Sequence, residues 1–173
     1  MVRGVDLVRR KIIIGALCIV IAVLLCITGI LIGRLNKKSA VTSVVSKIEQ
    51  GYNDRNLNSI VACFPNEFSD QIRDSFLNQA SGGTEQDLWK LLEDSYGKDY
   101  TASFTARSIT YVDDNELSEK MKSINSKWNI NLQAKEAAVC KVDEIYKGTK
   151  RAETTESYFI GKIDNDWYVL DVE

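Results

Sequence analysis

The chain has 173 residues, enough for one domain, and it contains no histidine. The sequence therefore lacks the most versatile acid–base group near neutral pH, the base of Ser-His and Cys-His nucleophile pairs, and the commonest metal ligand. Residues 39–173 carry 15 basic and 23 acidic side chains, a net charge of −8, which excludes nucleic acid as a partner because phosphate binding needs a basic surface.

The first predicted element is a membrane span at Ile12–Gly33. This uncharged run of 22 residues would form roughly 33 Å of helix, which matches a hydrocarbon core of about 30 Å. Three alternatives compete. A cleaved signal peptide is disfavoured because the run is long and no small-residue cleavage site follows it. A lipoprotein anchor is disfavoured because a leucine, and not a small residue, precedes both Cys18 and Cys26. A buried helix of a soluble protein is disfavoured because a helix with no polar face would be exceptional.

Basic residues on the two sides of this run set its predicted orientation. Four precede it and three follow it: Arg3, Arg9, Arg10, Lys11, Arg34, Lys37 and Lys38. Lys and Arg gather on the cytoplasmic side of a membrane helix. The sequence thus predicts a cytoplasmic tail over 1–11, a transmembrane helix over 12–33, a juxtamembrane hinge over 34–39 and an extracytoplasmic domain over 40–173. The predicted localisation is the cell membrane, as a single-pass, signal-anchored protein.

Small residues recur at helical spacing along the predicted span. Ala22, Cys26, Gly29 and Gly33 form a candidate pairing face, because small residues let two membrane helices approach closely. A homodimer through this helix is one interpretation. The other is accident, since small residues and GxxxG pairs are common in membrane helices.

Four helices are predicted next, from apolar residues at helical spacing. They cover residues 39–52, 57–64, 68–77 and 84–96. Pro65 ends the second helix, Gly82 and Gly83 break the chain after the third, and Thr84 opens the fourth as part of a capping box.

From Tyr100 the apolar period changes to that of a strand. Ala102, Phe104 and Ala106 alternate, and the phase then slips to Ile109 and Tyr111, which predicts a bulged strand. Asp113 is predicted to cap a helix that runs to Trp128. Three strands follow, at Ala138–Tyr146, Thr149–Ile163 and Trp167–Val172. This order predicts an α+β fold in which an antiparallel sheet curls over the helices.

Two segments of the chain carry a family resemblance. Val44–Pro65 reads as a helix, a short turn, a second helix and an apolar-Pro ending, and Tyr158–Leu170 reads as a final hairpin with Trp-Tyr in its last strand. On these features residues 40–173 resemble the nuclear transport factor 2-like superfamily, with its cystatin-like cone, and most of all its membrane-tethered versions from Gram-positive bacteria. The resemblance implies N-terminal helices packed in a curved antiparallel sheet. It brings no catalytic signature, and a fold alone does not fix a function.

Residues that could carry chemistry are few. Enzymes of this superfamily work with buried Asp, His or Tyr in the cone, and Tyr146, Tyr158 and Glu156 lie on strands that could line one. No spacing singles out an acid and a base, so we interpret them as two interior tyrosines and an exposed glutamate. Asp113–Glu116 lacks the pattern of a calcium loop, and there is no phosphate-binding glycine loop. We predict no catalytic, metal or cofactor-binding residue, and a core position for each tryptophan.

Cys63 and Cys140 are a candidate disulfide if the domain lies outside the cell. The alternative interpretation is two separate buried thiols, which behave as small hydrophobic side chains.

Two classes of function follow. The predicted one is a membrane-tethered binding or assembly module without catalytic activity, whose partner is an unknown protein or envelope component. The alternatives are a small-ligand or histidine-free enzyme pocket in the cone, and a scaffold subunit like that of type IV secretion. A cone filled by Trp89, Trp128 and aliphatic side chains would exclude a substrate, whereas a cavity of about 300 Å³ or more with a buried carboxylate would favour an enzyme. We expect the filled cone.

Overall fold

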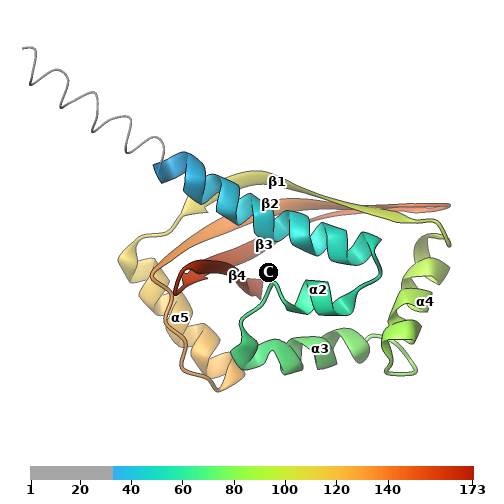
Figure 1. Cartoon of the computed structure of the whole chain (residues 1–173), viewed down its shortest axis with the longest axis horizontal. Helices are drawn as coiled ribbons and strands as arrows, with labels where there is room; N and C mark the ends of the chain where they lie inside the picture. Colours follow the sequence, from blue (N-terminus) through green and yellow to red (C-terminus); the bar gives the residue numbers. More distant parts are fainter. Residues whose placement is uncertain (1–32) are drawn as a thin grey trace, which may run out of the picture. The chain divides into compact units, whose positions relative to one another are not determined.

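The computed structural model describes residues 33–173, and Ala40–Glu173 form one compact unit. This unit is α+β. Four antiparallel strands form a single sheet, and the helices precede it or connect its first two strands (Figure 1).

Among residues 33–173 no helix is both long and apolar enough to cross a membrane, because each is short or carries charged side chains. This finding contradicts the predicted fold class in its transmembrane part, and with it the predicted single-pass cell-membrane localisation. The proposed span 12–33 and the pairing residues Ala22, Cys26 and Gly29 lie outside the described residues, and only Gly33 falls within them. Residues 34–39, predicted as a hinge, are helical.

Helical structure dominates the first half of the described chain. Residues 33–53, here called the first helix, are followed by α2 (Leu57–Val61), the 3-10 turn η1 (Asn66–Phe68), α3 (Ser69–Leu77) and α4 (Glu85–Tyr96). The α2 helix begins at Asn56, whose side chain accepts a hydrogen bond from the Ser59 backbone N–H. The predicted caps are confirmed, since Thr84 accepts from the Asp87 N–H at α4, and Asp113 accepts from two backbone N–H groups at α5 (Asp114–Trp128).

The sheet is a simple meander in which neighbours in sequence are neighbours in space. Its strands are β1 (Thr101–Tyr111), β2 (Glu136–Lys147), β3 (Arg151–Ile163) and β4 (Asp166–Val172), in the order β1-β2-β3-β4. The β1 register shifts between Ala106 and Ser108, which confirms the predicted bulge. A second shift between Phe159 and Ile160 bends β3 against β4.

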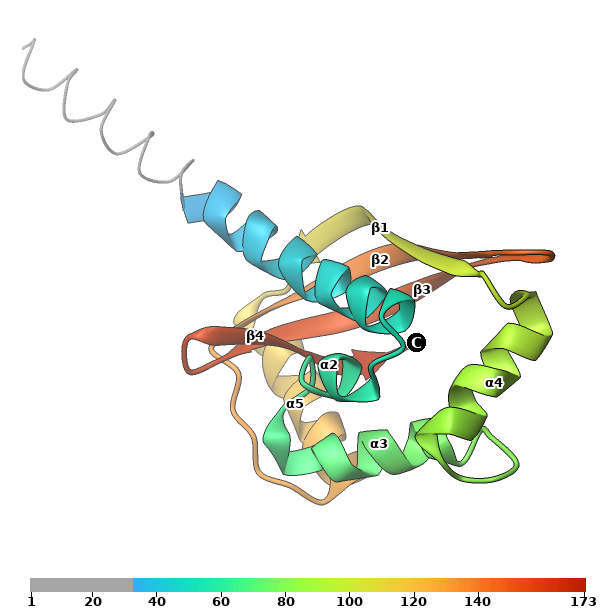
Figure 2. The ribbon, with the colours of Figure 1, turned by 45° about the vertical axis from the view of Figure 1, so that its right-hand side comes forward.

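The first helix and α2 lie on the same side of the sheet, and the two views agree on this arrangement (Figures 1 and 2). Helix α4 ends beside the β2–β3 turn, where the Lys150 N–H donates to the Tyr96 carbonyl over 3.2 Å. This turn needs Gly148, because a Cβ at that position would come within 2.2 Å of the same carbonyl oxygen.

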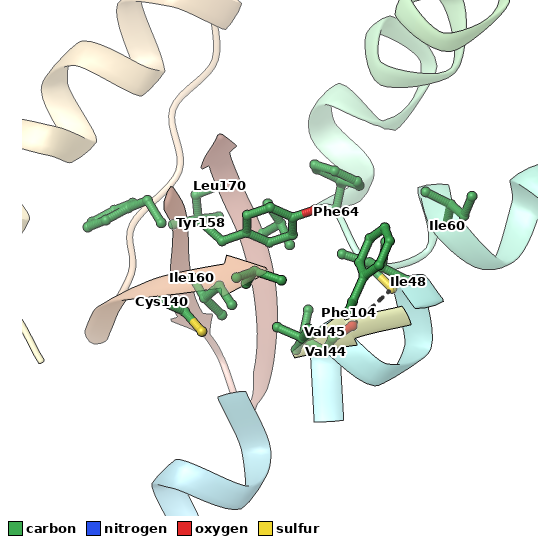
Figure 3. Packing of buried hydrophobic residues seen from close by; sticks show 14 of the residues in the cluster. Val44, Val45, Ile48, Ile60, Phe64, Phe104, Cys140, Tyr158, Ile160 and Leu170 are labelled. Atoms are coloured by element: carbon green, nitrogen blue, oxygen red, sulfur yellow. Dashed lines mark hydrogen bonds between the residues drawn. The ribbon is translucent and has the colours of Figure 1, made fainter. Parts of the chain in front are cut away.

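The core forms between the helices and the inner face of the sheet. The first helix contributes Val41, Val44, Val45 and Ile48, each at most 4% exposed. Figure 3 shows Tyr158, Ile160 and Leu170 from the strands on one side, and Ile48, Ile60 and Phe64 from the helical segment on the other. At about 25 cal/mol per Å² of buried apolar surface, this packing is the main force that holds the helices on the sheet.

Polar side chains of the first helix and its following turn pair with the free edge of β1. The Asn53 side chain accepts from the Ala102 N–H over 2.8 Å and donates to the Ala102 carbonyl over 2.9 Å. Glu49, one helical turn earlier, accepts from the Phe104 N–H over 2.8 Å. At the opposite edge, the Val169 N–H of β4 donates to the Cys63 carbonyl over 2.8 Å. Both edges of the sheet are therefore hydrogen-bonded by residues 49–63.

Replacing Asn53 by Ala should destabilise the fold, because two part-buried backbone groups of β1 lose their partner at once. We expect the free energy of unfolding in urea to fall by about 1–3 kcal/mol. The exposed Asn78→Ala at the end of α3 is the matched control, expected to change stability by less than about 0.5 kcal/mol. Equal effects of the two substitutions would contradict this account of the β1 edge.

Candidate functional site

A cavity of about 620 Å³ lies between the helices and the inner face of the sheet. Its walls come from the first helix, α2, α3, α5, β2, β3 and β4. The apolar part of the lining consists of Ile48, Ile60, Phe64, Ile72, Phe76, Trp128, Leu170 and Val172. We call this cavity the sheet pocket.

The expected filled cone is therefore wrong, and the placement of the two tryptophans explains why. The Trp128 ring stacks flat on Phe68, with ring centroids 5.2 Å apart and planes inclined by 7°, so it forms a wall. Trp89 meets Tyr52 edge to face at 6.3 Å and does not line the pocket. Neither ring occupies the space that the sheet and helices enclose.

Glu144 on β2 is the central polar residue of the pocket. It lies at an inward-facing position of β2 and is only 8% exposed. The Tyr158 hydroxyl donates to its Oε1 over 2.5 Å, and the Tyr146 hydroxyl donates to its Oε2 over 3.3 Å. Each carboxyl oxygen thus has a tyrosine donor from the inner face of the sheet.

Burial raises the pKa of Glu144, and the nearby negative charge of Glu156 raises it further. The hydrogen bonds from Tyr158 and Tyr146 lower it and offset part of this increase. Desolvation is the largest cause, because removing a carboxylate from water disfavours its charged form.

Three tyrosines surround this carboxyl group and stay protonated. Burial raises the pKa values of Tyr52, Tyr146 and Tyr158 well above the ordinary value, and the charge of Glu144 acts in the same direction. The Tyr52 and Tyr146 side chains are also hydrogen-bonded to each other. The Tyr146 and Tyr158 hydroxyls therefore act as fixed hydrogen-bond donors to Glu144, and none of the three tyrosines readily gives up its proton.

Three further charged residues line the pocket. Glu156 accepts a hydrogen bond from Thr154 over 2.9 Å. Lys127 of α5 forms an ion pair with Asp171 of β4 at 2.7 Å, and the Lys127 side chain is half-exposed. Within residues 33–173 the buried Nε1 of Trp128 has no hydrogen-bond acceptor, so the pocket wall holds an unused donor.

Sequence reasoning singled out part of this site and missed its centre. Tyr158 and Glu156 line the pocket, and Tyr146 is buried beside it. Glu144 was missed, although the sequence carried a signal for it. The inward-facing positions of β2 are Ala138, Cys140, Val142, Glu144 and Tyr146, so one charged residue interrupts a row of buried apolar and aromatic side chains.

The candidate disulfide is not formed. Cys63 and Cys140 are both free and buried. The Cys63 thiol points back to its own helical segment, where it donates to the Ser59 carbonyl over 3.4 Å, while Cys140 pairs with Tyr158 within the sheet. Burial raises the pKa of each thiol to about 11.

No group of three or more His, Cys, Asp or Glu side chains within residues 33–173 is arranged to hold a metal ion. The acidic run at Asp113–Glu116 caps α5 instead.

No family model, curated protein or solved structure matches the chain. The resemblance to the nuclear transport factor 2-like superfamily stays a prediction.

Replacing Glu144 by Gln should change how stability depends on pH. Because the pKa of Glu144 is raised above its ordinary 4.5, the folded chain binds this proton more tightly than the unfolded chain. Its contribution to stability is therefore present at low pH and is lost as pH rises from about 4.5 through the raised pKa. Urea denaturation across this range should show the stability difference moving in favour of Glu144→Gln. Parallel curves for the two proteins would contradict the burial of an ionisable group here.

Both described thiols should react slowly in the folded chain. The thiolate is the nucleophile, and a pKa of about 11 together with burial leaves little of it exposed at pH 8. Peptide mapping after iodoacetamide treatment should find Cys63 and Cys140 unlabelled in the native chain and labelled in urea. A cross-linked pair of Cys63 and Cys140 peptides, or rapid native labelling, is the contrary result.

Proposed function

We propose that residues 40–173 form a binding domain for a small organic molecule, which occupies the sheet pocket. The observation that carries this proposal is a cavity of about 620 Å³ whose interior exposes a buried carboxyl group held by two tyrosine hydroxyls. Small-molecule sites typically have volumes of about 300–1,000 Å³, with apolar walls and a few fixed polar groups.

The apolar and the polar groups of the lining have different roles in binding a ligand. Apolar and aromatic side chains from α2, α3 and α5 supply surface for the body of a ligand, and polar groups gather on the strands. A protein partner would instead need a broad surface, because stable protein interfaces bury about 800 Å² on each side. The volume of the cavity and the chemistry of its lining together favour a small molecule over the unknown protein or envelope partner that the sequence suggested.

The polar groups are also held in place before any ligand arrives. Tyr146 and Tyr158 lie on neighbouring strands, and their hydroxyls fix the Glu144 carboxyl group from two directions. A preorganised site loses less conformational entropy when its ligand binds. Because the strands hold these polar groups in position, the pocket is suited to recognising a ligand.

Proton transfer by Glu144 on a bound substrate is a second candidate function. The raised pKa of Glu144 favours this second function, because an effective acid–base group has a pKa near the working pH. An acid–base mechanism usually pairs two groups whose pKa values are pushed toward their tasks. Here burial moves the neighbouring tyrosine pKa values away from neutral pH, so the pocket supports binding better than catalysis.

Filling the pocket tests the binding function. Ser75 of α3 lines the cavity, and Ser75→Trp would place an indole in it. Ligand-observed NMR with a panel of aromatic and aliphatic amines, alcohols and acids should detect binding to the wild-type chain. We expect Ser75→Trp to weaken that binding at least about tenfold, since it removes the space that the ligand needs.

Asp74→Trp is the matched control, because Asp74 is exposed on the same helix and does not line the cavity. It should leave binding unchanged. Binding that survives Ser75→Trp, or a panel in which nothing binds the wild-type chain, would contradict the proposed function.

A further inference from the structure

We propose that the ligand of the sheet pocket carries a primary ammonium group on an apolar body, and that this group binds against Glu144 and Glu156. The inference rests on the proposed function and names the chemical class of its ligand.

Two carboxyl groups on adjacent strands face the same space. Val142 pairs with Glu156 and Glu144 pairs with Thr154 across β2 and β3, so the two glutamates are diagonal neighbours on the inner face. In the part of the chain that the structure describes, neither glutamate forms an ion pair with a basic side chain. Like charges placed this way repel each other until a cation or a proton neutralises them.

The basic side chain in the lining does not supply that neutralisation. Lys127 is bonded to Asp171 at 2.7 Å, and its ammonium group lies 5.2 Å from the Trp128 ring centroid. With this pair balanced, the two glutamates give the pocket a negative potential. An anionic ligand would be repelled, and a neutral one would leave the two carboxyl groups without a counter-charge.

Hydrogen-bonding capacity points to an ammonium group in particular. A carboxylate oxygen can accept two hydrogen bonds, and each Glu144 oxygen accepts one from a tyrosine. Each therefore keeps one free acceptor position, and Glu156 adds its own beside the bond from Thr154. A primary ammonium group brings three donors and one positive charge, which matches this set of acceptors.

The surrounding walls suit both a cation and an apolar body. Phe64, Phe76 and Trp128 line the cavity, and the Tyr52 and Tyr158 rings lie beside Glu144. Aromatic faces attract cations, and this attraction strengthens where water is excluded. The apolar part of the ligand would be buried against Ile60 of α2 and against Ile72 and Phe76 of α3.

A charge series on one molecular skeleton tests the inference. The probes are 2-phenylethylammonium, its neutral analogue 2-phenylethanol and the anionic 3-phenylpropionate, compared by calorimetric titration of the full chain at pH 7 and constant ionic strength. We expect the ammonium compound to bind at least about tenfold more tightly than the alcohol, with the carboxylate weakest.

Glu156→Gln removes one negative charge without emptying the core, and it should reduce the preference for the ammonium compound about tenfold. Glu153→Gln is the matched control, because Glu153 lies on the opposite face of β3 and is bonded to Arg151 at 2.8 Å. This control should preserve the preference.

Outcomes separate the two levels of the proposal. Equal or tighter binding of the alcohol or carboxylate, lost in Ser75→Trp, would overturn the ammonium inference and keep the binding function. An ammonium preference that Glu156→Gln leaves intact would also overturn it. No binding of any probe to the wild-type chain would overturn both proposals.

Discussion

The pairing of Asn53 and Glu49 with the edge of β1 is the constraint on which the rest of the domain depends. A free strand edge exposes unpaired backbone groups, and proteins must cover or pair it. Here one turn of helix does so with side chains, since Asn53 reproduces both hydrogen bonds of a missing strand. The first helix is thereby held along β1, and the space over β2, β3 and β4 is left for shorter helices to enclose.

That geometry explains why the domain encloses a pocket instead of a filled core. Strands β2 and β3 contain 12 and 13 residues, and their inner faces contribute Glu144, Glu156 and Tyr158 to the lining of the pocket. The α3 and α5 helices also contribute to this lining, and Trp128 at the end of α5 stacks on Phe68 of η1 and forms part of the wall. The stacked rings of Phe68 and Trp128 are thus packed against each other and do not occupy the cavity.

Local features were predictable from the sequence because short segments determine them. The caps at Thr84 and Asp113 and the bulge after Ala106 each arise within a few residues, and the structure has all three. Glu144 was not predictable in the same way. Its partner Tyr146 is a neighbour on β2, but Tyr158 reaches it through the register of β2 and β3. The alternation along β2 marks an inward-facing charge, but it does not show whether the space beside the strand is filled.

The predicted hinge at 34–39 differs from the structure for a physical reason. Assigning the polar segment 34–39 to a hinge weighed side-chain polarity alone, but polar residues are compatible with a helix that faces water, and the segment is helical. For Cys63 and Cys140 the sequence left two interpretations open, and the structure has the two separate buried thiols. Cys63 bonds within its own segment and Cys140 belongs to the sheet, so the chain places two thiols in separate surroundings.

Glu144 is better explained by recognition than by stability. An apolar side chain of similar volume at this β2 position would avoid the desolvation of a carboxyl group, and such replacements are often neutral or stabilising. The buried Glu144 carboxyl group also needs hydrogen-bond donors. Tyr146 and Tyr158 provide them through hydroxyls that would otherwise be buried without this partner. Three polar groups on one inner face thus depend on one another, and the like charge of Glu156 beside them adds repulsion. The positively charged ligand that we propose would neutralise this repulsion and make the arrangement a binding interaction.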